Sequence, residues 1–128
     1  MSLTNKRRAG GEDPRDAILA LGALLRDHKA LDVAVLDLRE CNSWTDFFII
    51  GTAASSSHLE GLERHIKDFC GDQGLEILRR SPRPRGDAED DWRVTDLGAV
   101  VIHLMSQRAR TFYELERLWS AAPVVFRA

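Results

Sequence analysis

The chain has 128 residues, 44% of them hydrophobic, and a formal net charge of −2. This length is typical of one domain, and the near-neutral charge disfavours a nonspecific nucleic-acid binder, which is usually clearly basic. The two cysteines, Cys41 and Cys70, have no metal-binding spacing and indicate thiols in a reducing cytosol, with a single disulfide left open. Neither a signal-peptide core nor a membrane-length apolar segment occurs, so the sequence predicts a soluble, cytoplasmic protein without a membrane partner.

The beginning of the chain predicts a tail followed by a helix. Residues 1–12 have little apolar content and are interpreted as a flexible N-terminal tail, whose basic triplet at 6–8 could touch RNA. Asp13 is suited to the N-cap of a helix and Pro14 to its first position. Apolar residues then recur at helical spacing as far as His28, which is expected to act as a charge partner for the helix C-terminus.

Two apolar segments then favour strands, and a second helix follows them. Residues 31–38 are short and rich in branched apolar side chains. Residues 47–52 (FFIIGT) are apolar at consecutive positions, which indicates a strand covered on both faces. Ser57 and Glu60 have the spacing of a capping box at the start of the next helix.

The second half of the chain predicts three strands and a closing helix. Residues 75–79 (LEILR) are a strand candidate, and the polar loop after them contains Arg83 and Arg85, for which a solvated role is favoured over contact with RNA phosphates. Residues 92–105 alternate in polarity on both sides of a Leu-Gly turn, which predicts an antiparallel hairpin. A short helix ends before Pro123. The order α-β-β-α-β-β-β-α predicts an α/β, α+β-like single domain over 13–123, with a mixed sheet flanked by helices.

The small-residue loop at 51–57 raises the possibility of a nucleotide-using enzyme, because a helix N-terminus after a strand suits a phosphate. The loop has one glycine and no lysine, so neither phosphate-binding glycine motif is present. Nucleotidyl transfer also needs clustered carboxylates for magnesium. Asp37, Asp46 and Asp96 are scattered along the chain. A nucleotide-binding or nucleotidyltransferase-like enzyme is therefore the alternative, and it requires these three carboxylates to converge beside Ser55.

Two segments resemble the ribosomal silencing factor family (RsfS or Iojap). They are SWTDFFIIGTAASSSHLEGL at 43–62 and DDWRVTDLGAVVIHLMSQRARTFYELERLW at 90–119. The resemblance implies a nucleotidyltransferase-like fold without catalytic carboxylates, and a protein that is not an enzyme and uses no cofactor or metal. It further implies binding to the large ribosomal subunit through ribosomal protein number fourteen, with ribosomal RNA nearby. Such binding blocks joining of the small subunit and represses translation under nutrient limitation. The free protein is expected to be a homodimer.

The resemblance also implies a binding surface formed by the tryptophan strand, the hairpin beside it and the closing motif. Trp92 is the first candidate, because aromatic residues dominate binding hot spots. Asp96 has the further option of bracing the Asp-Leu-Gly turn. In the closing motif, Phe112, Leu115 and Trp119 are expected to pack in the interior. The candidate ribosomal-protein-binding residues are Trp92, Asp96, His103, Met105, Arg110, Tyr113 and Glu116.

Alternation along residues 100–105 assigns His103 and Met105 to one face, and Val100, Ile102 and Leu104 to the core face.

Two positions depart from the family's usual pattern. Ala99 stands where members usually carry an aspartate, and Ser57 stands where they often carry an arginine. The first change removes a carboxylate that could pair with a basic ribosomal surface, and the second removes a cation near a helix start. Thr45 and Asp46 match the first motif, and a structural role for them is equally open.

Overall fold

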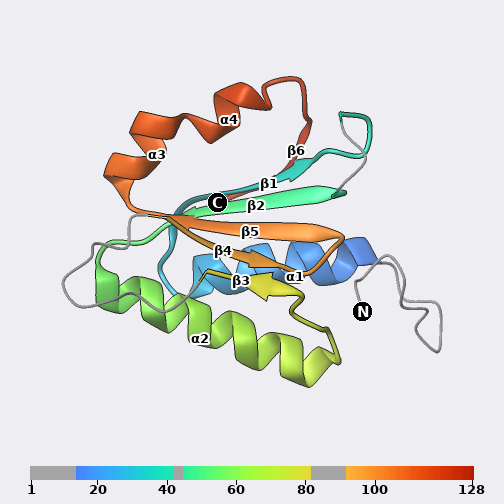
Figure 1. The fold of residues 1–128 in the computed structure, drawn as a ribbon, viewed down its shortest axis with the longest axis vertical. Coiled ribbons are helices and arrows are strands. Elements are labelled where there is room, and N and C mark those ends of the chain that lie inside the picture. The colour runs from blue at the N-terminus through green and yellow to red at the C-terminus, as the bar shows by residue number, and fades with distance from the viewer. Residues whose placement is uncertain (1–13, 42–44, 82–91) are drawn as a thin grey trace.

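The computed structural model describes residues 14–41, 45–81 and 92–128. Figure 1 shows a sheet with the long helices on one side and the short helices on the other. The elements are α1 (Pro14–Asp27), β1 (Leu31–Asp37), β2 (Phe47–Thr52), α2 (Ser56–Gln73), β3 (Arg79–Arg80), β4 (Trp92–Asp96), β5 (Val100–Met105), α3 (Gln107–Tyr113), α4 (Leu115–Leu118) and β6 (Val124–Arg127).

The sheet has six strands in the order β3-β4-β5-β2-β1-β6. The central pair, β2 and β5, is parallel, and every other neighbouring pair is antiparallel. The predicted single domain with a mixed sheet flanked by helices is therefore confirmed, and so is the hairpin formed by β4 and β5.

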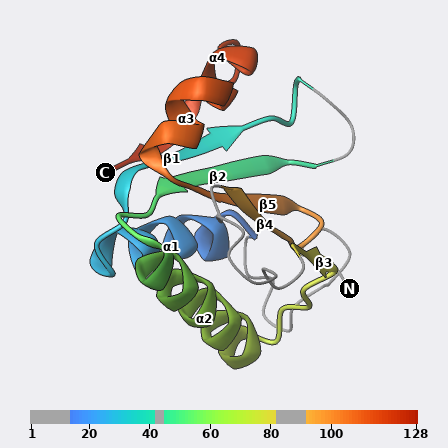
Figure 2. The same cartoon turned by 60° about the vertical axis from the view of Figure 1, so that its left-hand side comes forward.

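Hydrophobic cores on both faces of the sheet bury the central strands completely. The chain turns from β2 into α2 on one side and from β5 into α3 on the other, as Figure 2 shows from a second direction. In α1, Ile18, Leu21 and Leu25 face the sheet with no exposed surface. Burial of each such side chain contributes about 1.5–3 kcal/mol relative to exposure. Every residue of β2 and β5 is buried, as consecutive apolar positions predicted for β2.

The start of α2 differs from the predicted capping box. Ser55 is the N-cap, with an extended backbone (φ −160°), and its Oγ accepts a hydrogen bond from the His58 amide at 3.1 Å. The prediction of Ser57 as the cap was therefore wrong by two residues. The loop is closed further by His58, whose Nδ1 accepts from the Ala54 amide at 2.9 Å. Position 57 lies inside the first turn.

Two strands differ from the sequence-based prediction. Only Arg79 and Arg80 pair with β4, so most of the predicted strand at 75–79 has no regular secondary structure. Its first residue, Leu75, packs into the core directly after the left-handed Gly74 that ends α2. Strand β6 was not predicted. It follows Pro123 and pairs antiparallel with β1 at the edge of the sheet. The predicted tail at 1–12 lies outside the described residues.

Candidate functional site

Exposed aromatic and apolar side chains gather on α3 and α4. Phe112 and Leu118 are each 75% exposed, and Tyr113 is 49% exposed. The Tyr113 ring lies 5.0 Å from that of Phe112 and 4.7 Å from that of Trp92, measured between centroids. Trp92 is partly buried at the start of β4. We call Trp92, Phe112, Tyr113 and Leu118 the aromatic surface. Trp92 and Tyr113, both predicted as binding residues, are thus in contact.

The prediction that Phe112 packs in the interior was wrong, and a kink in the chain explains why. Phe112, Leu115 and Trp119 have the spacing of one continuous helix face. Glu114 adopts a left-handed backbone (φ 48°) and separates α3 from α4. Leu115 is buried and Trp119 packs against the core between the sheet and the two short helices, as predicted, whereas Phe112 is turned outward.

His103 lies directly beneath the aromatic surface. Its Nδ1 accepts a hydrogen bond from the Trp92 indole Nε1–H at 3.0 Å, and the Phe48 ring meets it edge-on at 4.5 Å. His103 is only 6% exposed, and this burial lowers the pKa of its imidazole to about 4. The ring is therefore neutral near pH 7 with its proton on Nε2. Within the described part of the chain, no hydrogen-bond partner meets that nitrogen.

Arg110 and Glu116 attach the two short helices to the sheet. Arg110 is 8% exposed, and its guanidinium donates to Thr52 Oγ1 and to Glu116 Oε1, each at 3.0 Å. The other carboxylate oxygen of Glu116 lies 3.7 Å from a guanidinium nitrogen of Arg127 on β6. One buried arginine therefore joins the end of β2 to α4, and Glu116 extends the connection to β6.

The remaining predicted site residues have internal roles. Met105 is fully buried in the core beneath α3. Asp96 Oδ1 accepts a hydrogen bond from the Gly98 amide at 2.8 Å. Asp96 therefore braces the Asp-Leu-Gly turn, which is one of the two roles predicted for it. Thr45, two residues before β2, donates from Oγ1 to the Gly98 carbonyl at 3.0 Å. The side chains of Met105, His103 and Arg110 therefore lie below the aromatic surface, and any part they play in binding passes through the residues above them.

Position 99 is also internal. Ala99 is 1% exposed and belongs to the core beneath α1 and α2. Its carbonyl accepts from the amides of Asp46 and Phe47. In this chain the alanine side chain therefore contributes to the core, and the loss of a carboxylate for a basic ribosomal surface stays a prediction.

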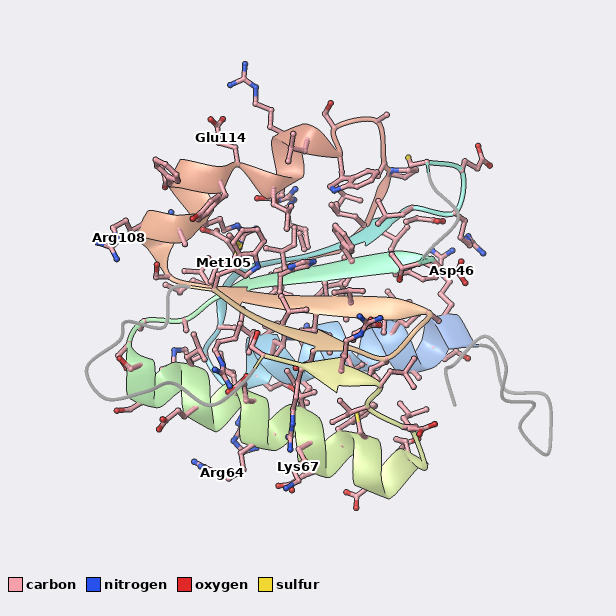
Figure 3. The ribbon with its side chains drawn as sticks, in the orientation of Figure 1. Asp46, Arg64, Lys67, Met105, Arg108 and Glu114 are labelled. Atoms are coloured by element: carbon pink, nitrogen blue, oxygen red, sulfur yellow. The ribbon has the colours of Figure 1, made fainter. Side chains whose placement is uncertain are left out.

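The three carboxylates required by the enzyme alternative lie at the wrong end of the sheet. Asp46 directly precedes β2, Asp37 pairs with the first residue of β2, and Asp96 ends β4 beside the start of β5. Ser55 follows the opposite end of β2, and a strand of six residues spans roughly 20 Å. Figure 3 shows Asp46 and Met105 at these two ends. Among the described residues, no group of three metal-binding side chains occurs.

Two backbone amides of the loop at 51–57 are already used within the protein. Ala53 N–H donates to the Met105 carbonyl, and Ala54 N–H donates to His58. His58 Nε2 in turn donates to the carbonyl of His28 at 2.8 Å. The His28 ring stacks on that of His65 at 3.6 Å between centroids, so it packs against α2. Its role as a charge partner for the end of α1 stays a prediction.

Both cysteines are free, which removes the disulfide option.

Asp37 forms a bidentate ion pair with Arg39, and this hydrogen bonding lowers the pKa of the carboxyl group. Within the described ranges, none of the helices has the length and hydropathy needed to cross a membrane.

The fold and the surface define a single α/β domain with a mixed sheet and an exposed aromatic surface. The family described as "Ribosomal silencing factor during starvation" matches residues 11–127, and the chain belongs to this family. Ribosomal silencing factor RsfS of Treponema pallidum is 38% identical over 103 residues, covering 80% of this chain and 89% of that protein. RsfS of Bacillus subtilis is 32% identical and covers 84% and 89%.

A eukaryotic protein and two solved structures are also similar to this chain. The mouse protein "Mitochondrial assembly of ribosomal large subunit protein 1" is 35% identical over 78% of this chain and 43% of its own length. A crystal structure from Bacillus halodurans superposes with a TM-score of 0.69 at 30% identity, covering 87% and 98% of the two chains. One from Chromobacterium violaceum has a TM-score of 0.75 at 24% identity, covering 85% and 88%. Both share the fold.

Proposed function

We propose that this chain binds the large ribosomal subunit through ribosomal protein number fourteen and prevents the small subunit from joining. In this proposal it represses translation in the cytoplasm when nutrients are limiting. The proposal is supported by the names of the bacterial relatives, which are ribosomal silencing factors, and by the mouse relative named for the large subunit.

The observation that carries the proposal is the aromatic surface. Large exposed apolar patches mark sites of interaction with other proteins. Aromatic residues are also enriched among those that dominate binding energy. Phe112 and Leu118 stabilise little in the isolated domain, because three-quarters of each residue's surface is exposed to water. Covering them with a partner would remove this apolar area from water.

The mechanism is steric exclusion and requires no covalent step. A domain of 128 residues has a radius of gyration of about 14 Å. Two surfaces that must come into van der Waals contact cannot meet while a body of that size occupies one of them. The activity of the protein is therefore its binding, and it is not an enzyme in this proposal.

Co-sedimentation with purified large subunits at low salt tests the proposal. The wild type should sediment with the subunits, and Phe112→Ala should weaken binding by about 2 kcal/mol, or roughly thirtyfold, if Phe112 is a hot spot. Leu78→Ala is the matched control, because it also shortens an exposed apolar residue, 45% exposed, away from α3 and α4. A wild-type chain that stays in the supernatant, or equal losses for the two variants, would contradict the proposal.

We also propose that the free chain is a homodimer. The aromatic surface again supports this, since an uncovered apolar surface favours self-association. Analytical ultracentrifugation of the free protein tests it. A single species at the monomer mass across the micromolar range would contradict it.

A further inference from the structure

The hydrogen bond from Trp92 to His103 holds the edge of the aromatic surface to the sheet. It joins adjacent strands, since Trp92 begins β4 and His103 lies in β5. The acceptor has little freedom, because Phe48 meets the His103 ring edge-on and Trp119 meets the Phe48 ring at 5.7 Å. Trp92 in turn packs against Tyr113. A chain of contacts therefore runs from the buried core to the exposed ring of Tyr113.

A histidine is an unfavourable choice for this position on packing grounds alone. Its Nε2–H is buried and meets no acceptor among the described residues, and an unsatisfied buried donor destabilises a fold. The flanking residues on the same face of β5, Val101 and Met105, are apolar and fully suited to the core. A leucine at 103 would avoid the unsatisfied donor. What leucine cannot supply is an acceptor for the indole of Trp92.

We propose that His103 is a positioning residue for the binding of the partner: its Nδ1 holds the Trp92 indole in the one orientation that supports Tyr113. This inference rests on the proposed function and assigns His103 a role without direct contact to the partner. When the acceptor is absent, the partly buried indole is free to turn its N–H toward water. The fraction of molecules with the competent surface then falls, and the apparent affinity falls by the same factor.

Two substitutions separate positioning from packing. His103→Asn keeps an acceptor oxygen near the place of Nδ1, whereas His103→Leu keeps apolar volume and removes the acceptor. His103→Asn should bind large subunits within about twofold of the wild type. Because a freed side chain divides among a few staggered rotamers, His103→Leu should bind about three- to tenfold more weakly. Its melting temperature should nevertheless equal or exceed that of the wild type. If binding by the two variants instead follows their melting temperatures, the role of His103 is only structural.

A double-mutant cycle with Trp92→Phe shows whether the effect passes through the indole N–H. Phenylalanine keeps an aromatic ring and removes the donor. His103→Leu should then cost no further affinity in the Trp92→Phe background. An equal loss in both backgrounds would overturn the proposal, because His103 would be acting independently of Trp92.

Hydrogen exchange of the Trp92 indole tests the same claim without ribosomes. The indole N–H signal in a ¹H–¹⁵N spectrum should exchange slowly in the wild type and in His103→Asn, and at least tenfold faster in His103→Leu. Fast exchange in the wild type would overturn the inference even if the subunits are bound. Failure of the wild type to bind subunits, together with slow indole exchange, would instead contradict the proposed function and leave the Trp92–His103 bond established.

Discussion

Lowering the pH from 7.5 to 4 should reduce the free energy of unfolding, and His103 should contribute about 3 kcal/mol to that loss. The burial of His103 lowers its pKa to about 4 in the folded chain, against 6.5 for an ordinary histidine. Between these two values the unfolded chain holds more protons than the folded chain. Stability therefore falls as the pH falls through this window.

The size of the effect follows from the two pKa values. Linkage gives a loss of about 2 kcal/mol at pH 5 and about 3 kcal/mol at pH 4, relative to neutral pH. Protonation also removes the acceptor at Nδ1, so the hydrogen bond from Trp92 is lost at the same time. Urea unfolding at several pH values, followed by far-UV circular dichroism, measures the free energy directly.

His103→Leu is the control for the other titrating groups. The rings of His28, His58 and His65 are present in both proteins, so their contributions cancel in the difference between the two pH profiles. The wild type should lose stability relative to His103→Leu as the pH falls from 6.5 to 4. Parallel profiles would refute the reasoning, because they would show that His103 titrates alike in the folded and unfolded chains.

Two further predictions concern the buried arginine and the cysteines. Arg110→Met should lower the free energy of unfolding by about 2–3 kcal/mol in urea, since it removes charge-assisted hydrogen bonds to Thr52 and Glu116. Arg117→Met is the control, because it breaks an exposed ion pair with Glu114 and should change the free energy of unfolding by less than about 0.5 kcal/mol. Similar losses of stability for Arg110→Met and Arg117→Met would contradict the stabilising role of Arg110. In native protein at pH 8, iodoacetamide should modify Cys41 well before Cys70, because burial raises the pKa of the Cys70 thiol to about 11. Mass spectrometry of proteolytic digests measures the rate at which each cysteine is modified. Equal rates for Cys41 and Cys70 would contradict the prediction.

The fold could be predicted from periodicity wherever an element is long or fully apolar. Helical spacing found α1 and α2, and consecutive apolar residues found β2 with both faces covered. The short elements could not be found in this way. In β3 only two residues pair, and β6 has four residues that follow a proline, so neither has enough length for a periodic signal.

The site was predicted in part, and the errors have one physical source. Alternation correctly separated His103 and Met105 from Val100, Ile102 and Leu104. It could not show that α3 and α4 cover the second face, because that depends on where the chain turns after β5. Likewise, helical spacing placed Phe112 inward, whereas the left-handed Glu114 rotates it outward. Exposure of the aromatic surface is thus a property of tertiary structure.

Light scattering during the mixing of purified ribosomal subunits is the most direct test of the account. Large subunits preincubated with an excess of the wild-type chain should fail to join small subunits, and the scattering increase should disappear. Phe112→Ala at the same concentration should restore most of the increase, and Leu78→Ala should inhibit like the wild type. An undiminished scattering increase with wild-type chain bound to every large subunit would show that binding does not exclude the small subunit.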